Sequence, residues 1–200
     1  MQVDHRKGPR RRGEVLEEAI MQAALAELAE VGYMNVSMER IAARARTSKA
    51  ALYRRWPDRA HLIVDSYVRF VVDDVDIPDT GSLRTDLMVL LRQLANVITS
   101  PVVMMLFGLL VDAGDNGELR AVIRERVATL KPVLISDILE RARARGELRK
   151  PLTRRQSTLP IDLLRNEVVQ ILLRDGPAGE IPDSTIEEIV DEIFLPLVRA

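Results

Sequence analysis

Cysteine is absent from the 200 residues, and histidine occurs only at His5 and His61. Without thiols the chain has no disulfide bond and no zinc or iron–sulfur site that requires thiolate ligands. Two histidines cannot by themselves form a histidine-based metal site. The composition fits a reducing cytosol, and we expect neither a metal nor a cofactor.

Long hydrophobic runs are also missing. The longest, PVVMMLFGLLV at residues 101–111, is about half the length that a membrane-spanning helix needs. The opening stretch QVDHRKGPRRRGEV lacks the apolar core of a signal peptide. We therefore expect a cytoplasmic protein that does not span a membrane.

The motifs of common enzyme classes are absent as well. The chain has no cysteine nucleophile, no glycine-rich phosphate loop and no spare histidine to serve as a general base beside a serine. Paired carboxylates such as Asp73-Asp74 and Glu187-Glu188 fall at the surfaces or ends of expected helices, where solvation explains them. We expect a protein that is not an enzyme.

Charge is distributed unevenly along the chain, although the net charge is only −1. Residues 1–60 contain twelve Lys and Arg against eight Asp and Glu, whereas the remaining residues contain seventeen against twenty-two. A basic end joined to an acidic body indicates that one end has a polyanionic partner. Charge alone does not identify that polyanion.

Apolar residues recur with the helical period throughout, and no stretch alternates like a strand. We predict an all-α protein of roughly nine helices. Pro132 should bend its helix, and Pro160 should interrupt or delay the start of the next. Residues 77–82 (IPDTGS) are the clearest linker. The helices are expected at about 13–31, 37–45, 48–56, 57–74, 82–99, 102–114, 117–145, 154–174 and 184–199.

Two of the predicted short helices, joined by Arg46-Thr47, form a helix-turn-helix. In that motif the second helix enters the major groove of DNA, and its first residues reach base edges while flanking groups hold phosphates. Ser48 caps this helix, and Ala51 and Leu52 face inward. The outward-facing residues are Lys49, Ala50, Tyr53 and Arg54.

Flanking groups supply further phosphate contacts. The Tyr53 hydroxyl can donate to a phosphate oxygen while its ring packs. The backbone N–H groups at the start of the next helix, beside Arg59, are expected to form a second anion site. A cationic arm ahead of the first helix is placed to follow the DNA backbone or a minor groove. The predicted DNA-binding residues are Arg10, Arg11, Arg12, Ser37, Thr47, Ser48, Lys49, Ala50, Tyr53, Arg54 and Arg59.

The stretch SMERIAARARTSKAALYRRWPDRAHL resembles the N-terminal domain of TetR-family transcriptional regulators, whose pattern is T-x-x-x-I-A-x-x-A-G-V-S-x-x-x-L-Y-x-H-F-x-x-K-x-x-L. Three departures stand out. Arg46 occupies the usual glycine position in the turn and costs roughly 1 kcal/mol if a left-handed conformation is kept there. Trp56 replaces phenylalanine, and Arg59 replaces lysine. The matching positions are Ser37, Ile41, Ala42, Ala45, Ser48, Leu52, Tyr53, Trp56 and Leu62.

The resemblance implies a DNA-binding domain at residues 1–62 and a ligand-binding and dimerisation domain at 63–200. GSLRTDLMVLLRQLA and RARARGELRKPL resemble a common ligand domain of the family. Its cavity would bind a mainly hydrophobic effector, although a core position is the default interpretation of each apolar residue. The expected cavity residues are Tyr67, Phe70, Leu91, Met104, Met105, Phe107, Leu110 and Val111.

Reading a palindromic operator requires two recognition helices, so we expect a homodimer. The last two predicted helices each carry an apolar stripe that can pair with its symmetry mate in a four-helix bundle. The alternative is that both stripes belong to the core of a single chain. The expected interface residues are Leu164, Val168, Ile171, Ile186, Ile189, Ile193 and Phe194.

The sequence therefore predicts a dimeric, ligand-responsive transcription factor, most simply a repressor. One alternative is a constitutive DNA-binding protein without an effector, from which release of DNA by a small molecule would distinguish it. Another is a helical lipid-binding or interaction protein whose basic end touches a membrane. The short, capped helix-turn-helix argues against the latter, because helices that lie on membranes are usually longer amphipaths.

Overall fold

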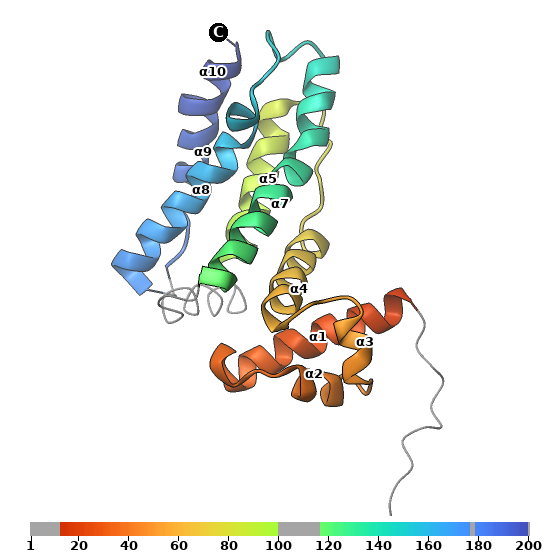
Figure 1. Ribbon diagram of the computed structural model, residues 1–200. Coiled ribbons are helices and arrows are strands. Elements are labelled where there is room, and N and C mark those ends of the chain that lie inside the picture. Colours follow the sequence, from red (N-terminus) through yellow and green to blue (C-terminus); the bar gives the residue numbers. More distant parts are fainter. Residues whose placement is uncertain (1–12, 100–116, 177–178, 200) are drawn as a thin grey trace, which may run out of the picture. The chain divides into compact units, whose positions relative to one another are not determined.

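The computed structural model describes residues 13–99, 117–176 and 179–199, and these residues form helices and no strand. The all-α prediction is confirmed (Figure 1). The chain divides into two compact units, Met1–Ser66 and Tyr67–Ala200. No helix in the described ranges is long and apolar enough to cross a membrane.

The first unit contains α1 (Glu14–Val31), α2 (Met38–Arg44) and α3 (Lys49–Tyr53). Gly32 ends α1 with φ 69° and ψ 161°, a conformation that is essentially restricted to glycine. Helical spacing places large apolar side chains on the inner faces of these elements. The fully buried members include Ile20, Leu28, Ile41 and Leu52.

The helix α4 (Arg59–Asp73) begins in the first unit, and the boundary between the units falls within it. Trp56 precedes it and is buried, as expected for a residue in the phenylalanine position. Its indole N–H donates to the Asp65 carboxylate at 3.1 Å. The larger ring therefore fills the core and also satisfies its polar atom.

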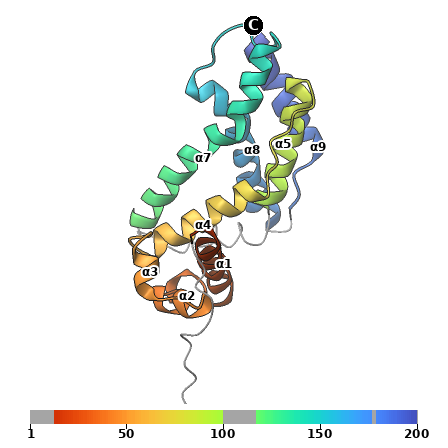
Figure 2. The ribbon, with the colours of Figure 1, turned by 90° about the vertical axis from the view of Figure 1, so that its right-hand side faces the viewer.

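The second unit is built on α5 (Leu83–Ile98), α7 (Gly117–Ala144) and α8 (Arg154–Asp175), which pack together around one apolar core (Figures 1 and 2). The helix expected at 102–114 lies outside the described residues. Pro160 neither interrupts nor delays α8, which corrects the prediction. A capping box between Thr153 and Gln156 starts this helix.

The last helical stretch changes its winding. It consists of α9 (Asp183–Glu187), a π-helical segment η4 (Glu188–Phe194) and α10 (Leu195–Arg199). Phe194 and Val198 are buried, whereas Ile193 and Leu197 are 40% and 41% exposed. The wider turn of the π segment, which ends at Phe194, accounts for this division. One apolar stripe in the sequence thus becomes two differently facing sets of side chains.

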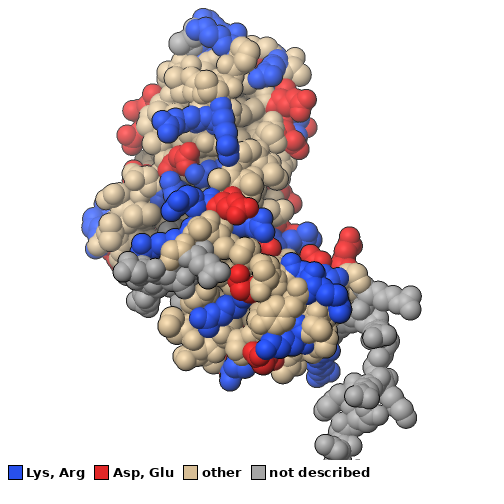
Figure 3. Space-filling view, in the orientation of Figure 1, with Lys and Arg blue, Asp and Glu red and all other residues tan. Residues whose placement is uncertain are grey.

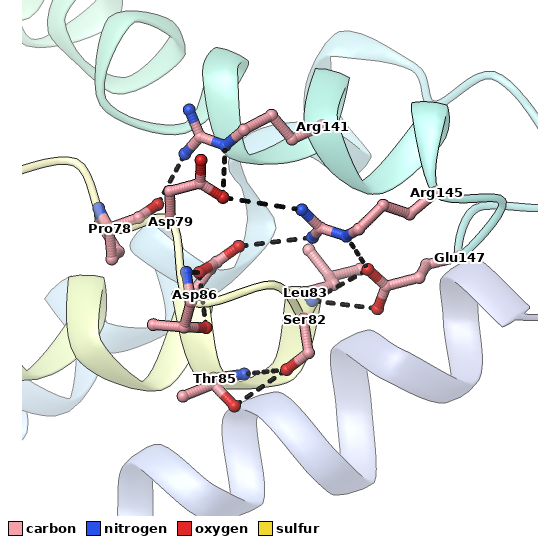
Figure 4. Close-up of polar contacts among 10 residues, drawn as sticks. Pro78, Asp79, Ser82, Leu83, Thr85, Asp86, Arg141, Arg145 and Glu147 are labelled. Atoms are coloured by element: carbon pink, nitrogen blue, oxygen red, sulfur yellow. Dashed lines mark hydrogen bonds and ion pairs between the residues drawn. The ribbon is translucent and has the colours of Figure 1, made fainter.

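A polar network ties the linker before α5 to the end of α7 (Figure 4). Asp86 is fully buried and accepts hydrogen bonds from the Thr80 N–H at 2.6 Å and the Thr80 hydroxyl at 2.8 Å. Arg145 donates to Glu147 at 2.7 Å and approaches Asp86 at 3.4 Å. Glu147 accepts the backbone N–H of Leu83 at 2.9 Å, so the network also satisfies the first turn of α5.

Candidate nucleic-acid interface

The helix α3 separates its side chains into an inner and an outer set. Ser48 caps it by accepting a hydrogen bond from the Ala51 N–H at 3.3 Å. Ala51 and Leu52 are buried, whereas Lys49 and Tyr53 are exposed. The five-residue helix ends at Tyr53, earlier than expected, and the N–H groups of Arg55 and Trp56 then donate to the Leu52 carbonyl at 2.9 and 3.0 Å. The exposed face is therefore short and close to the cap.

The turn between α2 and α3 has a strained residue at its centre. Arg46 has a φ of 53°, the only positive φ of a non-glycine residue in the described part of the chain. Its N–H donates to the Ala43 carbonyl at 3.1 Å, and the Thr47 N–H donates to the Ala42 carbonyl at 2.9 Å. Backbone hydrogen bonds thus hold the turn in a conformation that favours glycine. Arg46 therefore keeps the positive φ that glycine would adopt at this position of the family pattern.

Two arginines of α2 bind a buried carboxylate of α1. Glu27 is only 2% exposed, and it forms ion pairs with Arg40 and, at 3.1 Å, with Arg44. The hydrogen bond from Arg40 lowers the pKa of Glu27 and outweighs the opposing effect of burial. Arg44 also pairs with the exposed Glu30. These cations orient the helix-turn-helix instead of projecting freely toward a ligand.

Lys49, the predicted base or phosphate contact, is held by Glu39 of α2. Its ammonium group also lies 5.5 Å from the centre of the Tyr53 ring. The hydrogen bond between Lys49 and Glu39 raises the pKa of Lys49 and lowers that of Glu39. To contact DNA, Lys49 must therefore leave Glu39. The opposite charges of the two residues were visible in the sequence, but their proximity depends on the angle between α2 and α3.

Arg59 differs from the expectation of a free phosphate ligand. Its guanidinium donates to the backbone carbonyls of Val36 at 2.8 Å and Met34 at 3.3 Å, and it lies 4.6 Å from the centre of the Tyr33 ring. This side chain braces the segment between α1 and α2. Its partners within the described residues are carbonyl groups and an aromatic ring of the same unit.

The expected anion site at the start of α4 is occupied by a side chain of the chain itself. Asp58 accepts the His61 N–H at 2.9 Å, and its other oxygen lies 2.8 Å from the His61 ring nitrogen. An acidic cap already satisfies this helix terminus and repels a phosphate. The prediction of a second anion site at these N–H groups is therefore wrong.

The remaining predicted DNA-binding residues fall into three groups. Ser37 caps α2 by accepting the Arg40 N–H at 3.2 Å, and Thr47 is half-buried in the turn. Ala50 and Arg54 are exposed on or beside α3. The arm of Arg10, Arg11 and Arg12 lies outside the described residues. On the face shown in Figure 3, acidic side chains lie among the Lys and Arg side chains of the first unit.

The expected ligand-binding residues are described only in part. Leu91 is fully buried in the core of the second unit, and Tyr67 and Phe70 pack partly buried against it. Burial raises the pKa of Tyr67 to about 12, so its hydroxyl stays protonated even in moderately alkaline solution. The other five, Met104, Met105, Phe107, Leu110 and Val111, lie outside the described residues.

The expected dimer interface needs correction. Only Ile193 of its seven residues is exposed, and the other six are buried among side chains of their own chain. A side chain already covered in its own subunit has no surface to offer a partner. The alternative of an intrachain core therefore describes these six better. They are Leu164, Val168, Ile171, Ile186, Ile189 and Phe194.

Comparison with known proteins agrees with this architecture. Residues 20–65 match the model of bacterial regulatory proteins of the tetR family, and residues 77–193 match that of the tetracyclin repressor-like C-terminal domain. The chain belongs to the TetR family of transcriptional regulators, which bind DNA and are not enzymes.

Similar proteins match along most of their length. The HTH-type transcriptional regulator YdeS of Bacillus subtilis is 33% identical, covering 94% of this chain and 92% of that protein. The DNA-binding transcriptional repressor TetR of Mycobacteroides abscessus is also 33% identical, covering 94% and 96%.

Solved structures share the fold. The TetR family transcription regulator SCO0332 superposes with a TM-score of 0.69 at 26% identity, covering 90% of this chain and 97% of that one. FadR from Bacillus subtilis, solved in complex with stearoyl-CoA, gives 0.63 at 18% identity, covering 88% and 98%.

Proposed function

We propose that the protein is a homodimeric repressor that a small hydrophobic molecule releases from a palindromic operator. Such a regulator acts in the cytoplasm, which contains the operator DNA. The observation that carries the DNA-binding half of the proposal is the division of α3, which buries Ala51 and Leu52 and exposes Lys49, Ala50 and Tyr53 beside the Ser48 cap. This arrangement suits a short helix whose first residues enter a major groove.

Three of the exposed groups have distinct chemical capacities. Lys49 can donate to a base edge or a phosphate once it exchanges Glu39 for DNA. Tyr53 is 48% exposed and can donate its hydroxyl to a phosphate oxygen. The exposed methyl group of Ala50 offers an apolar contact of the kind that distinguishes a thymine. Specificity would then come from few base pairs per subunit, which requires two subunits.

A second copy would dock on α8 and the last helix. Each of these helices leaves large apolar side chains exposed, Leu173 at 79%, Ile193 at 40% and Leu197 at 41%. They belong to helices that pack against each other within the chain. The interface proposed here replaces the buried stripe residues with these exposed ones. In a two-fold symmetric dimer the same exposed residues of both subunits would face each other.

The effector half of the proposal rests on apolar chemistry. The second unit is rich in aliphatic side chains, and Tyr67 contributes a protonated hydroxyl beside them. The similarly folded FadR was solved with stearoyl-CoA, a ligand with a long apolar chain. An effector must bind the DNA-released conformation better than the DNA-bound one, by several kcal/mol for nearly complete release. α4 is the natural lever because it belongs to both units.

One experiment tests both halves. The purified protein is incubated with genomic DNA fragments, and protected sites are mapped by footprinting with and without a panel of long-chain acyl compounds and other hydrophobic molecules. We expect protection of a palindrome, which disappears when the active compound is added. Protection that no compound relieves, even one that raises the melting temperature, would favour the constitutive DNA-binding protein. Absence of any protected site would contradict the repressor.

A further inference from the structure

Most cations in the described part of the first unit, residues 13–66, are engaged within the chain. Arg40 and Arg44 bind the carboxylates of α1, and Lys49 binds Glu39. Arg55 pairs with Glu17 at 3.3 Å, and Arg59 donates to backbone carbonyls. A charge that already has a partner must exchange it to bind a phosphate, and giving up the ion pair offsets part of the new interaction.

Two arginines in this range are different. The guanidinium groups of Arg46 and Arg54 have no ion pair, hydrogen bond or ring contact with any residue of the described ranges, and both residues are exposed. They also lie on either side of α3 in the sequence. Arg46 lies in the turn two residues before the Ser48 cap, and Arg54 directly follows Tyr53. The two free cations thus flank the exposed face of α3.

Arg46 is also unfavourable for the fold at its position. Its φ of 53° would suit glycine or asparagine better than arginine, and its guanidinium makes no interaction within the described residues that offsets this strain. A residue before the start of a recognition helix stands at the edge of the groove, where phosphates form the wall. Arginine suits such a position because its planar fork donates two hydrogen bonds to one phosphate.

We infer that Arg46 binds a DNA phosphate beside the start of α3, while Arg54 binds one beside its end. This inference rests on the proposed DNA binding and adds a residue that the resemblance does not supply, because the family pattern has glycine at this position. The interaction fixes the position of α3 on the duplex and carries no sequence information. Arg46 therefore adds affinity for every DNA sequence alike.

The test compares Arg46→Gly with Arg46→Lys on a duplex of arbitrary sequence, about three helical turns long, by fluorescence anisotropy. Glycine removes the charge and relieves the strain, so the melting temperature should rise by about 2–4 °C while DNA affinity falls. The salt slope should fall by about 0.9 for each phosphate that the variant no longer neutralises. Between 50 and 200 mM salt, wild type should then weaken about 3.5-fold more than Arg46→Gly for each such phosphate.

Arg46→Lys keeps the charge and should retain most of the affinity and the salt slope. Arg174→Ala is the matched control, because Arg174 is an exposed arginine of the second unit that pairs with its neighbour Asp175. It should change neither DNA binding nor its salt dependence. An opposite response of stability and affinity in Arg46→Gly cannot arise from misfolding.

The outcomes separate this inference from the proposed function. If Arg46→Gly is more stable but binds DNA like wild type, with an unchanged salt slope, Arg46 does not bind a phosphate. DNA binding itself would stand in that case, and weaker binding by Tyr53→Phe would still assign it to α3. If the wild-type protein binds neither this duplex nor genomic fragments at about 50 mM salt, where phosphate contacts are strong, the proposed function fails instead.

Discussion

Glu27 is the residue on which the orientation of α2 depends most directly. Its carboxylate is buried, and two arginines of α2 reach it from the neighbouring helix. Hydrogen bonds to a charged group contribute about 1.5–3 kcal/mol each, and the partial exposure of both arginines reduces that contribution. Glu27 therefore holds α2 against α1 from inside the first unit.

Replacing Glu27 with glutamine should lower the free energy of unfolding by about 1–3 kcal/mol at pH 7. The lowered pKa of Glu27 means that its contribution is complete above the unfolded pKa near 4.5 and is lost as the pH falls through the folded value. The difference between wild type and Glu27→Gln should therefore shrink below about pH 4.5. Urea unfolding at several pH values measures it.

The matched control is Glu30→Gln, because Glu30 lies on the same helix but is exposed. An exposed ion pair contributes about 0–1 kcal/mol, so this variant should stay close to wild type at every pH. Equal losses in both variants would mean that burial of Glu27 adds nothing to the pair.

At the scale of elements, the linker before α5 is held by side chains that the sequence did not single out. Arg141 donates to the Pro78 carbonyl at 2.6 Å, and Arg145 joins Asp86 to Glu147 (Figure 4). These residues come from segments about 60 positions apart, as the Leu83 and Glu147 pair shows with a separation of 64. The network therefore connects the linker and the start of α5 to the end of α7.

Asp86→Ala should destabilise the protein by about 1–3 kcal/mol, because it removes the buried carboxylate that accepts the N–H and hydroxyl of Thr80 and pairs with Arg145. Asp86→Asn keeps an oxygen acceptor and should lose less. Glu140→Ala, at an exposed position of α7, should match wild type. Thermal unfolding followed by circular dichroism ranks the three variants. A harmless Asp86→Ala would show that the linker does not depend on this carboxylate.

At the scale of the whole molecule, assembly depends on which apolar residues the last helix leaves outside. The π-helical segment buries Phe194 and exposes Ile193, and the next turn repeats this division with Val198 and Leu197. Charges at buried Ile189 would unfold the chain, so they cannot test a dimer. Charges at the exposed pair can.

Ile193→Glu combined with Leu197→Glu should convert the dimer to a monomer at micromolar concentration, since like charges would face each other across a two-fold axis. Analytical ultracentrifugation measures the mass, and circular dichroism should show intact helices. Val133→Glu is the control, because Val133 is 60% exposed on α7. A double variant that still sediments as a dimer would place the interface elsewhere.

Features that depend on residues close together in the chain could be read from the sequence. The helical class, the caps at Ser37 and Ser48 and the buried pair Ala51-Leu52 follow from spacing along the chain, and the family follows from the resemblance of the helix-turn-helix. The same periodicity predicted most helices to within a few residues, because an apolar face and a capping side chain are local signals.

The partner of each charged or apolar group, by contrast, depends on how the helices pack. Lys49 meets Glu39, Arg59 turns to backbone carbonyls, and Asp58 covers the start of α4. The π-helical segment likewise shifts the apolar stripe by one residue, so that Phe194 becomes core and Ile193 becomes surface. The physical reason is that charge and hydrophobicity are read from one residue at a time, whereas pairing and burial depend on the angle and register between elements distant in sequence.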